Sequence, residues 1–229
     1  MAMQLENVVP FGRSLDEYSH MFNLSEQDLQ KQILGVGDGP ASFNAEGTRL
    51  GYRITSIDPL YKFTASQIRD RFTAVVEDVI GQIERSPNAW VWSYHSSPAH
   101  LRTHRERVTE LFCQDFEQGQ LENRYRLGEL PHLPYPNHEF ELGLCSHFLF
   151  LYSEHFDEQF HLDSVRELLR VCREVRIFPL LTLMRSPSPH LPAVLSMLRT
   201  NGYQYSIQTV AYELQRGGNQ MLQICRPPS

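Results

Sequence analysis

The sequence predicts an α/β protein built on a mainly parallel sheet. Two compact strand-like stretches, "QILGVG" at 32–37 and "YRITSID" at 52–58, enclose a glycine-rich turn and a segment long enough for a short helix. Amphipathic helices then alternate with further strand-like stretches to the end of the chain. With 229 residues, 41% hydrophobic and 21% charged, the chain is long enough for one large domain and too apolar to be disordered.

Short helices are predicted near the N-terminus. Ser14 and Glu17 have the spacing of a capping box, which opens a helix. Ser25 followed by Asp28 suggests a second helix start. We therefore expect residues 1–31 to form a helical cover on the sheet.

A helical insertion is predicted at residues 64–123, between the second and third strands. "TASQ" caps a helix whose apolar side chains recur at helical spacing, and Ser97-Pro98 fits the start of another helix. The second helix carries Arg102, Arg105 and Arg107 on its polar side, which we expect to face water.

The remainder of the chain resumes the alternation. "RYRLGEL", "FELGLC" and "EVRIFPLLTL" are predicted strands, and "HLPAVLSMLRTNG" is a predicted helix. Two last strands surround a Gly217-Gly218-Asn219 turn. Because a hairpin joins antiparallel neighbours, we expect the parallel sheet to be finished by an antiparallel edge strand.

The composition disfavours several classes of function. The formal net charge is −6 with no long basic run, so a nucleic-acid partner is disfavoured. Four cysteines without a CxxC pair are typical of reduced thiols in the cytoplasm. No apolar run approaches about 18 residues, so we expect no membrane span. His100 and His104 lack the acid of an HExxH zinc site, and we expect no metal.

The stretch "ILGVGDGPASF" suggests a ligand. Gly35, Gly37 and Gly39 let a ligand approach the backbone, and Asp58 follows at the end of the next strand, about 20 residues further on, where an acid binds ribose hydroxyls. A dinucleotide site needs a third glycine that neither register supplies, and Pro40 lacks an N–H that a pyrophosphate would use. S-adenosyl-L-methionine, a nucleoside without phosphates, fits better than a nicotinamide dinucleotide.

Six motifs between residues 12 and 225 carry a resemblance to a known family: "GRSLDEYSHMF", "ILGVGDGPASFNAE", "IDPLY", "LPHLPYPNHEFELGLCSHFLFLY", "EVRIFPLL" and "YELQRGGNQML". Together they resemble a bacterial group within the class I S-adenosylmethionine-dependent methyltransferases. The resemblance implies one Rossmann-like methyltransferase domain over residues 1–229, S-adenosyl-L-methionine as cofactor, and methyl transfer. It implies no particular acceptor and no oligomeric state.

The resemblance also implies which residues contact the cofactor. They are the glycine turn, the ribose-binding acid with its neighbour, the acidic-apolar pair that meets adenine, and the end of the fourth strand: Gly35, Val36, Gly37, Asp38, Gly39, Asp58, Pro59, Glu129, Leu130, Cys145 and Ser146. Many relatives carry an acid at the position of Gly35, where it orients the methionine end, and Asp38 could take over that role.

His147 follows the fourth strand and is the candidate general base for an acceptor that arrives protonated. Its other interpretation is a packed side chain under the cover.

We therefore expect an enzyme that methylates a small molecule. The tetrapeptide "DPLY" is similar to the D-P-P-Y motif of nucleic-acid amino-methylating enzymes, but it follows the second strand rather than the fourth. Two alternatives remain: a protein that binds S-adenosylmethionine or S-adenosylhomocysteine without transferring a methyl group, as a sensor or partner, and a nicotinamide-dependent oxidoreductase.

Overall fold

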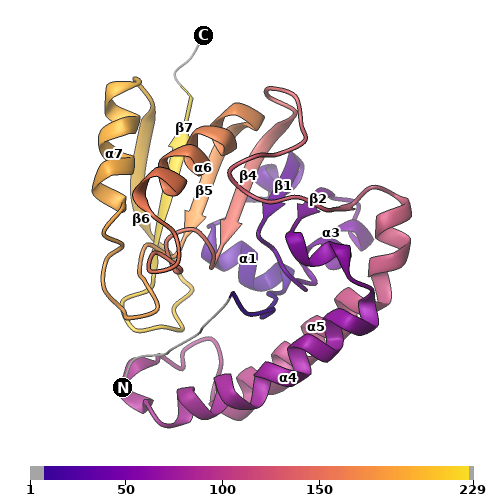
Figure 1. Cartoon of the computed structure of the whole chain (residues 1–229). Coiled ribbons are helices and arrows are strands. Elements are labelled where there is room, and N and C mark those ends of the chain that lie inside the picture. The colour runs from indigo at the N-terminus through magenta and orange to yellow at the C-terminus, as the bar shows by residue number, and fades with distance from the viewer. Residues whose placement is uncertain (1–7, 227–229) are drawn as a thin grey trace.

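A seven-stranded sheet in the order β3-β2-β1-β4-β5-β7-β6 forms the centre of the molecule (Figure 1). The computed structural model describes residues 8–226, so the first seven residues of the predicted cover lie outside it. The first five strands pair in parallel: β1 (Gln32–Val36), β2 (Arg53–Ile57), β3 (Tyr125–Arg126), β4 (Phe140–Ser146) and β5 (Cys172–Phe178). The predicted α/β fold is confirmed.

The last two strands form the predicted antiparallel hairpin, but their order differs from the expectation. β7 (Gln220–Cys225) lies between β5 and β6 (Gln204–Thr209) and is antiparallel to both, so β6 is the edge strand. Burial explains this order. β7 buries Met221, Leu222 and Ile224, whereas most of β6 is polar and exposed, so the apolar strand takes the interior position.

Helices cover both faces of the sheet. One face packs against α1 (Leu15–Met21) and α3 (Phe43–Arg49), with the short α2 (Glu26–Leu29) between them in the chain. The other packs against α6 (Glu158–Val171) and α7 (Leu191–Thr200). Ile33 and Leu34 point to opposite faces, as successive strand residues do. Within residues 8–226, no helix combines the length and apolarity that crossing a membrane would need.

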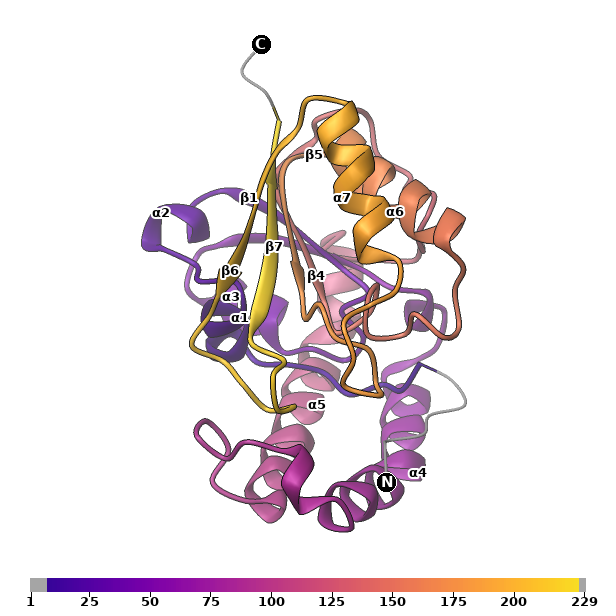
Figure 2. The same cartoon turned by 90° about the vertical axis from the view of Figure 1, so that its left-hand side faces the viewer.

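The segment between β2 and β3 forms a helical arm, which we define as residues 65–121. It contains α4 (Ala65–Glu84), the 3-10 turn η2 (Pro87–Ala89) and α5 (Pro98–Leu121), and it follows another 3-10 turn, η1 (Pro59–Lys62). Thr64 and Gln67 form a capping box that starts α4, and the Ser97 hydroxyl accepts from the His100 N–H to start α5. Figure 2 shows α4 and α5 side by side beyond one end of the sheet.

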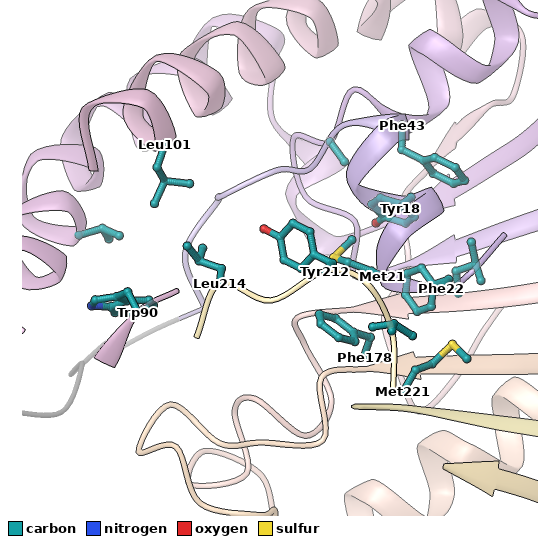
Figure 3. Packing of buried hydrophobic residues seen from close by; sticks show 14 of the residues in the cluster. Tyr18, Met21, Phe22, Phe43, Trp90, Leu101, Phe178, Tyr212, Leu214 and Met221 are labelled. Atoms are coloured by element: carbon teal, nitrogen blue, oxygen red, sulfur yellow. The ribbon is translucent and has the colours of Figure 1, made fainter. Parts of the chain in front are cut away.

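Apolar side chains join the arm to the sheet. Figure 3 shows Tyr212 and Leu214, from the segment before β7, between Trp90 of the arm and Phe178 at the end of β5. A backbone hydrogen bond of 2.8 Å from the Val91 N–H to the Leu214 carbonyl oxygen fixes this contact.

A buried ion pair joins α1 to α5 and corrects one expectation. Arg105 was expected to face water, yet it is fully buried, and its two terminal nitrogens lie 2.6 and 2.7 Å from the carboxylate oxygens of Glu17. The Tyr212 hydroxyl also donates to Glu17, at 2.9 Å. His95 and His104 each place Nε2 within 3.2 Å of the same carboxylate.

Electrostatics keeps that carboxylate ionised. Burial opposes ionisation of Glu17, but the Arg105 guanidinium and the hydrogen bonds from His104, His95 and Arg105 outweigh it and hold the pKa of Glu17 well below its usual range. The prediction failed because helical periodicity places Arg105 on the polar side of α5, while its partner lies 88 residues away in the chain.

Candidate functional site

The turn between β1 and α3 depends on two glycines. Gly37 has a φ of 70° and Gly39 a φ of 55°, in the left-handed region that favours glycine. The Gly37 N–H donates to the carbonyl oxygen of Ile57 at 3.0 Å, which fixes the turn beside the end of β2. The carboxyl ends of two adjacent parallel strands thus present one concave backbone surface.

Asp58 binds the same turn with its side chain. One carboxylate oxygen accepts from the Gly39 N–H at 2.8 Å, and the other accepts from the Leu60 N–H at 2.7 Å. Burial raises the pKa of Asp58 to about 6, the two backbone hydrogen bonds act against that rise, and the charge of Glu129 adds to it. The result is a rigid acceptor group that still borders open space.

Asp38 explains the glycine at position 35. A Cβ on Gly35 would lie 1.9 Å from the Asp38 carboxylate, so this carboxylate occupies the space that a side chain at position 35 would need. Tyr18 and Ser56 each donate a hydroxyl hydrogen bond of 2.6 Å to Asp38. The turn therefore carries its acid at position 38 rather than 35, and Gly35 itself does not line the cavity described below.

Adjacent residues at the end of β4 lie in different surroundings. Cys145 is fully buried and faces α6, and burial raises the pKa of its thiol to about 12, so it is an inert packed thiol. Ser146 and His147 instead line the cavity.

His147 is held tightly. Its φ is 50°, its N–H donates to the Phe178 carbonyl at 2.6 Å, and its Nδ1 lies 3.0 Å from the Ser146 hydroxyl. Burial and the charges of Arg13 and Arg105 hold the pKa of His147 well below its usual range. Its imidazole is neutral near pH 7 and a weak base.

These groups surround one cavity of about 570 Å³ at the carboxyl ends of the strands. Every predicted site residue except Gly35 and Cys145 lines it. We call the part bounded by the glycine turn, Asp58 and Glu129 the turn side. This volume lies in the range of small-molecule binding sites.

The opposite part, which we call the apolar side, is lined mostly by aromatic and aliphatic groups. Its residues come from the arm, the segment after β4 with the start of α6, the segment after β5 and the segment before β7: Val79, Ile83, Trp90, Leu151, Phe156, Phe160, Leu183 and Leu214. Its surface suits an apolar ligand part and excludes water.

Sequence reasoning missed the residues that reach the cavity from distant segments. Trp90 and Leu214 gave no signal because an isolated apolar residue in a loop is typical of packing anywhere. Arg13 carried no such signal because a single arginine in a polar stretch is typical of an exposed position. The signal for Asp38 was stronger, since it lies within the glycine motif itself.

Comparison with solved structures identifies the class of fold. Over 93% of this chain and 54% of the other, the structure is similar to mitomycin 7-O-methyltransferase MmcR, with a TM-score of 0.51 and 11% identity. Magnesium protoporphyrin IX methyltransferase ChlM from Synechocystis PCC 6803 gives a TM-score of 0.49 at 11% identity, over 93% of this chain and 78% of that one. The sheet order and the hairpin define a Rossmann-like class I methyltransferase fold.

Sequence comparison then gives the family. No family model matches the chain. It is 33% identical over 225 residues to the uncharacterized protein MJ0045 of Methanocaldococcus jannaschii, covering 98% of this chain and 99% of that protein. The chain belongs to the same family as MJ0045. This relative is archaeal, so the expectation of a bacterial group stays a prediction.

Proposed function

We propose that the protein binds S-adenosylmethionine and transfers its methyl group to a small, largely apolar acceptor. The observation that carries this proposal is that one cavity joins the glycine turn and Asp58 to the apolar side. A carboxylate beside a glycine turn suits a ribose diol, because it accepts hydrogen bonds from both hydroxyls. A diphosphate suits the turn poorly, since Asp38 and Asp58 would repel it and Pro40 offers no N–H.

The proposed roles follow from position. Asp58 binds the ribose, Glu129 and Leu130 lie beside the adenine, and Ser146 faces the methionine part. The bound cofactor supplies an electrophilic methyl group on a sulfonium. The chain aligns the acceptor in the apolar side and excludes water there. Because His147 is a weak base, we assign it to the wall between the two sides rather than to proton removal.

The arm and the net charge point to the acceptor class. Val79, Ile83 and Trp90 of the arm form part of the apolar side, which favours an apolar small molecule over a nucleic acid. The formal net charge of −6 agrees with that choice. We also propose a cytoplasmic location, because all four cysteines are free.

Titration with S-adenosylhomocysteine by calorimetry tests the cofactor. At pH 7.5, Asp58→Asn should weaken binding by about 10- to 100-fold, because the ribose hydroxyls lose a charged acceptor. For the wild type, affinity should fall as the pH drops below about 6, where Asp58 takes up a proton, and the variant should lack this step. Asp78→Asn, an exposed change outside the cavity, is the control. Equal affinity for wild type and Asp58→Asn would remove Asp58 from the site.

Turnover separates an enzyme from a non-catalytic binding protein, the alternative that the weak basicity of His147 keeps open. Methyl-labelled S-adenosylmethionine is incubated with the protein and a metabolite extract, and methylated product is sought. His147→Ala should keep most of the turnover if the residue is only part of the wall. Loss of turnover with intact cofactor binding would instead make His147 the base.

A further inference from the structure

We propose that Arg13 is a carboxylate-binding residue of the cavity. Arg13 lines the cavity, and its side chain is partly buried. Within residues 8–226, its only hydrogen bond is donated by Nη1 to the Phe11 carbonyl, and its buried Nε has no partner. No carboxylate in that part of the chain forms an ion pair with it. A partly buried guanidinium whose Nε lacks a partner is costly unless an anion accepts its free hydrogen bond.

The other cations near the cavity are already satisfied. Arg105 is paired through two nitrogens with Glu17, and its charge adds to the electrostatic cost at Arg13. Lys62 also lines the cavity, but it is exposed, and its ammonium lies 5.2 Å from the centre of the Phe63 ring. Water can solvate Lys62, whereas Arg13 lacks comparable access. Arg13 is therefore the cation that a bound anion would stabilise most.

The position of Arg13 sets where the anion lies. A Cβ on Gly12 would be 2.1 Å from the Pro40 carbonyl oxygen, so the backbone beside Arg13 packs directly on the end of the glycine turn. The charge of Arg13 also acts on His147, at the end of β4. Arg13 thus reaches the boundary between the turn side and the apolar side.

The chemistry favours a carboxylate. A guanidinium presents a planar pair of donors that matches the two oxygens of a carboxylate. Asp38 and Asp58 line the same cavity and would repel a doubly charged phosphate more than a single negative charge. The inference rests on the proposed function for its two sources: the carboxylate of the cofactor's amino-acid tail, or a carboxylate on the acceptor.

The first arm of the test is calorimetry with two ligands. S-adenosylhomocysteine carries the carboxylate, and S-adenosyl-3-thiopropylamine is the same molecule without it. If the source is the cofactor, Arg13→Met should weaken S-adenosylhomocysteine by about 10- to 100-fold and change the decarboxylated analogue less than about twofold. Arg53→Met, which removes an exposed arginine outside the cavity, is the matched control and should change the affinity for neither ligand.

The second arm tests the acceptor as the source. 1-Naphthoate and the neutral 1-naphthylmethanol are titrated into the protein, both free and saturated with S-adenosylhomocysteine. If the acceptor supplies the carboxylate, wild type should bind the naphthoate at least about tenfold more tightly than the alcohol, and Arg13→Met should abolish that preference. Arg53→Met should retain that preference.

The outcomes are distinct. If Arg13→Met loses affinity for only one of the two carboxylate ligands, the proposal is supported and that ligand identifies the source of the carboxylate. If Arg13→Met binds all four ligands as wild type does, the proposal is wrong. If neither adenosyl ligand binds wild type, the proposed function fails, while the naphthoate arm on free protein still tests Arg13. Should Arg13→Met not fold, Arg13→Lys replaces it. This variant keeps the charge but loses the planar donor pair, so it should lower the preference for the carboxylate ligand over its counterpart without a carboxylate.

Discussion

The buried carboxyl group of Asp38 makes the stability of the fold depend on pH. Burial raises its pKa to about 7 from an ordinary value of 3.8, against the opposing hydrogen bonds from Ser56 and Tyr18, and the charge of Asp58 adds to the rise. A group with a raised folded pKa contributes stability that is complete below pH 3.8 and is lost as the pH rises through about 7. At about 1.4 kcal/mol per pH unit, that loss amounts to roughly 4 kcal/mol by pH 8.

Asp38→Asn removes this dependence with little change in shape. The amide oxygen can accept from Tyr18, and the amide N–H can donate to the Ser56 hydroxyl, which rotates to accept it. We expect Asp38→Asn to be more stable than wild type by about 2–4 kcal/mol at pH 8, and this difference to disappear by pH 4. Asp58 is present in both proteins, so only its charge interaction with Asp38 enters the difference.

Urea denaturation followed by tryptophan fluorescence at pH 4, 6 and 8 measures the two free energies of unfolding. Asp78→Asn, an exposed aspartate change, controls for the general effect of removing a negative charge. The reasoning is refuted if Asp38→Asn is less stable than wild type at pH 8, or if the difference between them is the same at all three pH values.

Two further substitutions test the packing of the site and of the arm. Gly35→Ala should destabilise the protein because its Cβ would displace the Asp38 carboxylate, and in an Asp38→Ala background this cost should fall by about 1–3 kcal/mol; additive free energies in the double-mutant cycle would contradict the close contact. Glu17→Gln should cost about 3–5 kcal/mol in urea denaturation because it leaves the Arg105 charge buried and unpaired, whereas Glu110→Gln on the surface of α5 should cost less than about 1 kcal/mol; similar costs would show that burial does not strengthen the Glu17 pair.

Local signals predicted most of the elements because their causes are local. Capping boxes at Ser14 and Thr64 mark helix starts that the structure confirms, and the period of the apolar residues distinguishes helix from strand. The position of β7 could not be read in this way. The hairpin requires β6 and β7 to pair, but which of them lies beside β5 depends on how much apolar surface each buries in the finished sheet.

Some residues of the candidate site were likewise predictable from spacing in the sequence, and others were not. The glycine turn and Asp58 are adjacent in the fold because they end neighbouring strands, so their spacing in the sequence was informative. Arg13, Trp90 and Leu214 reach the cavity from three separate segments, and no spacing rule connects them. The environment of Asp38 was equally hidden, because the space above Gly35 becomes visible only when both side chains are placed.

The carboxylate of Glu17 has a consequence for cooperativity. The arm projects beyond the sheet, and a helical pair in that position could open by itself while the sheet stayed folded. Glu17 joins α1, α5 and Tyr212 at one buried point, so separating the arm would expose an ion pair and disturb three segments at once. Amide hydrogens of α1 and α5 should therefore exchange with solvent in a shared opening event, which makes the arm and the N-terminal helix one unit of folding.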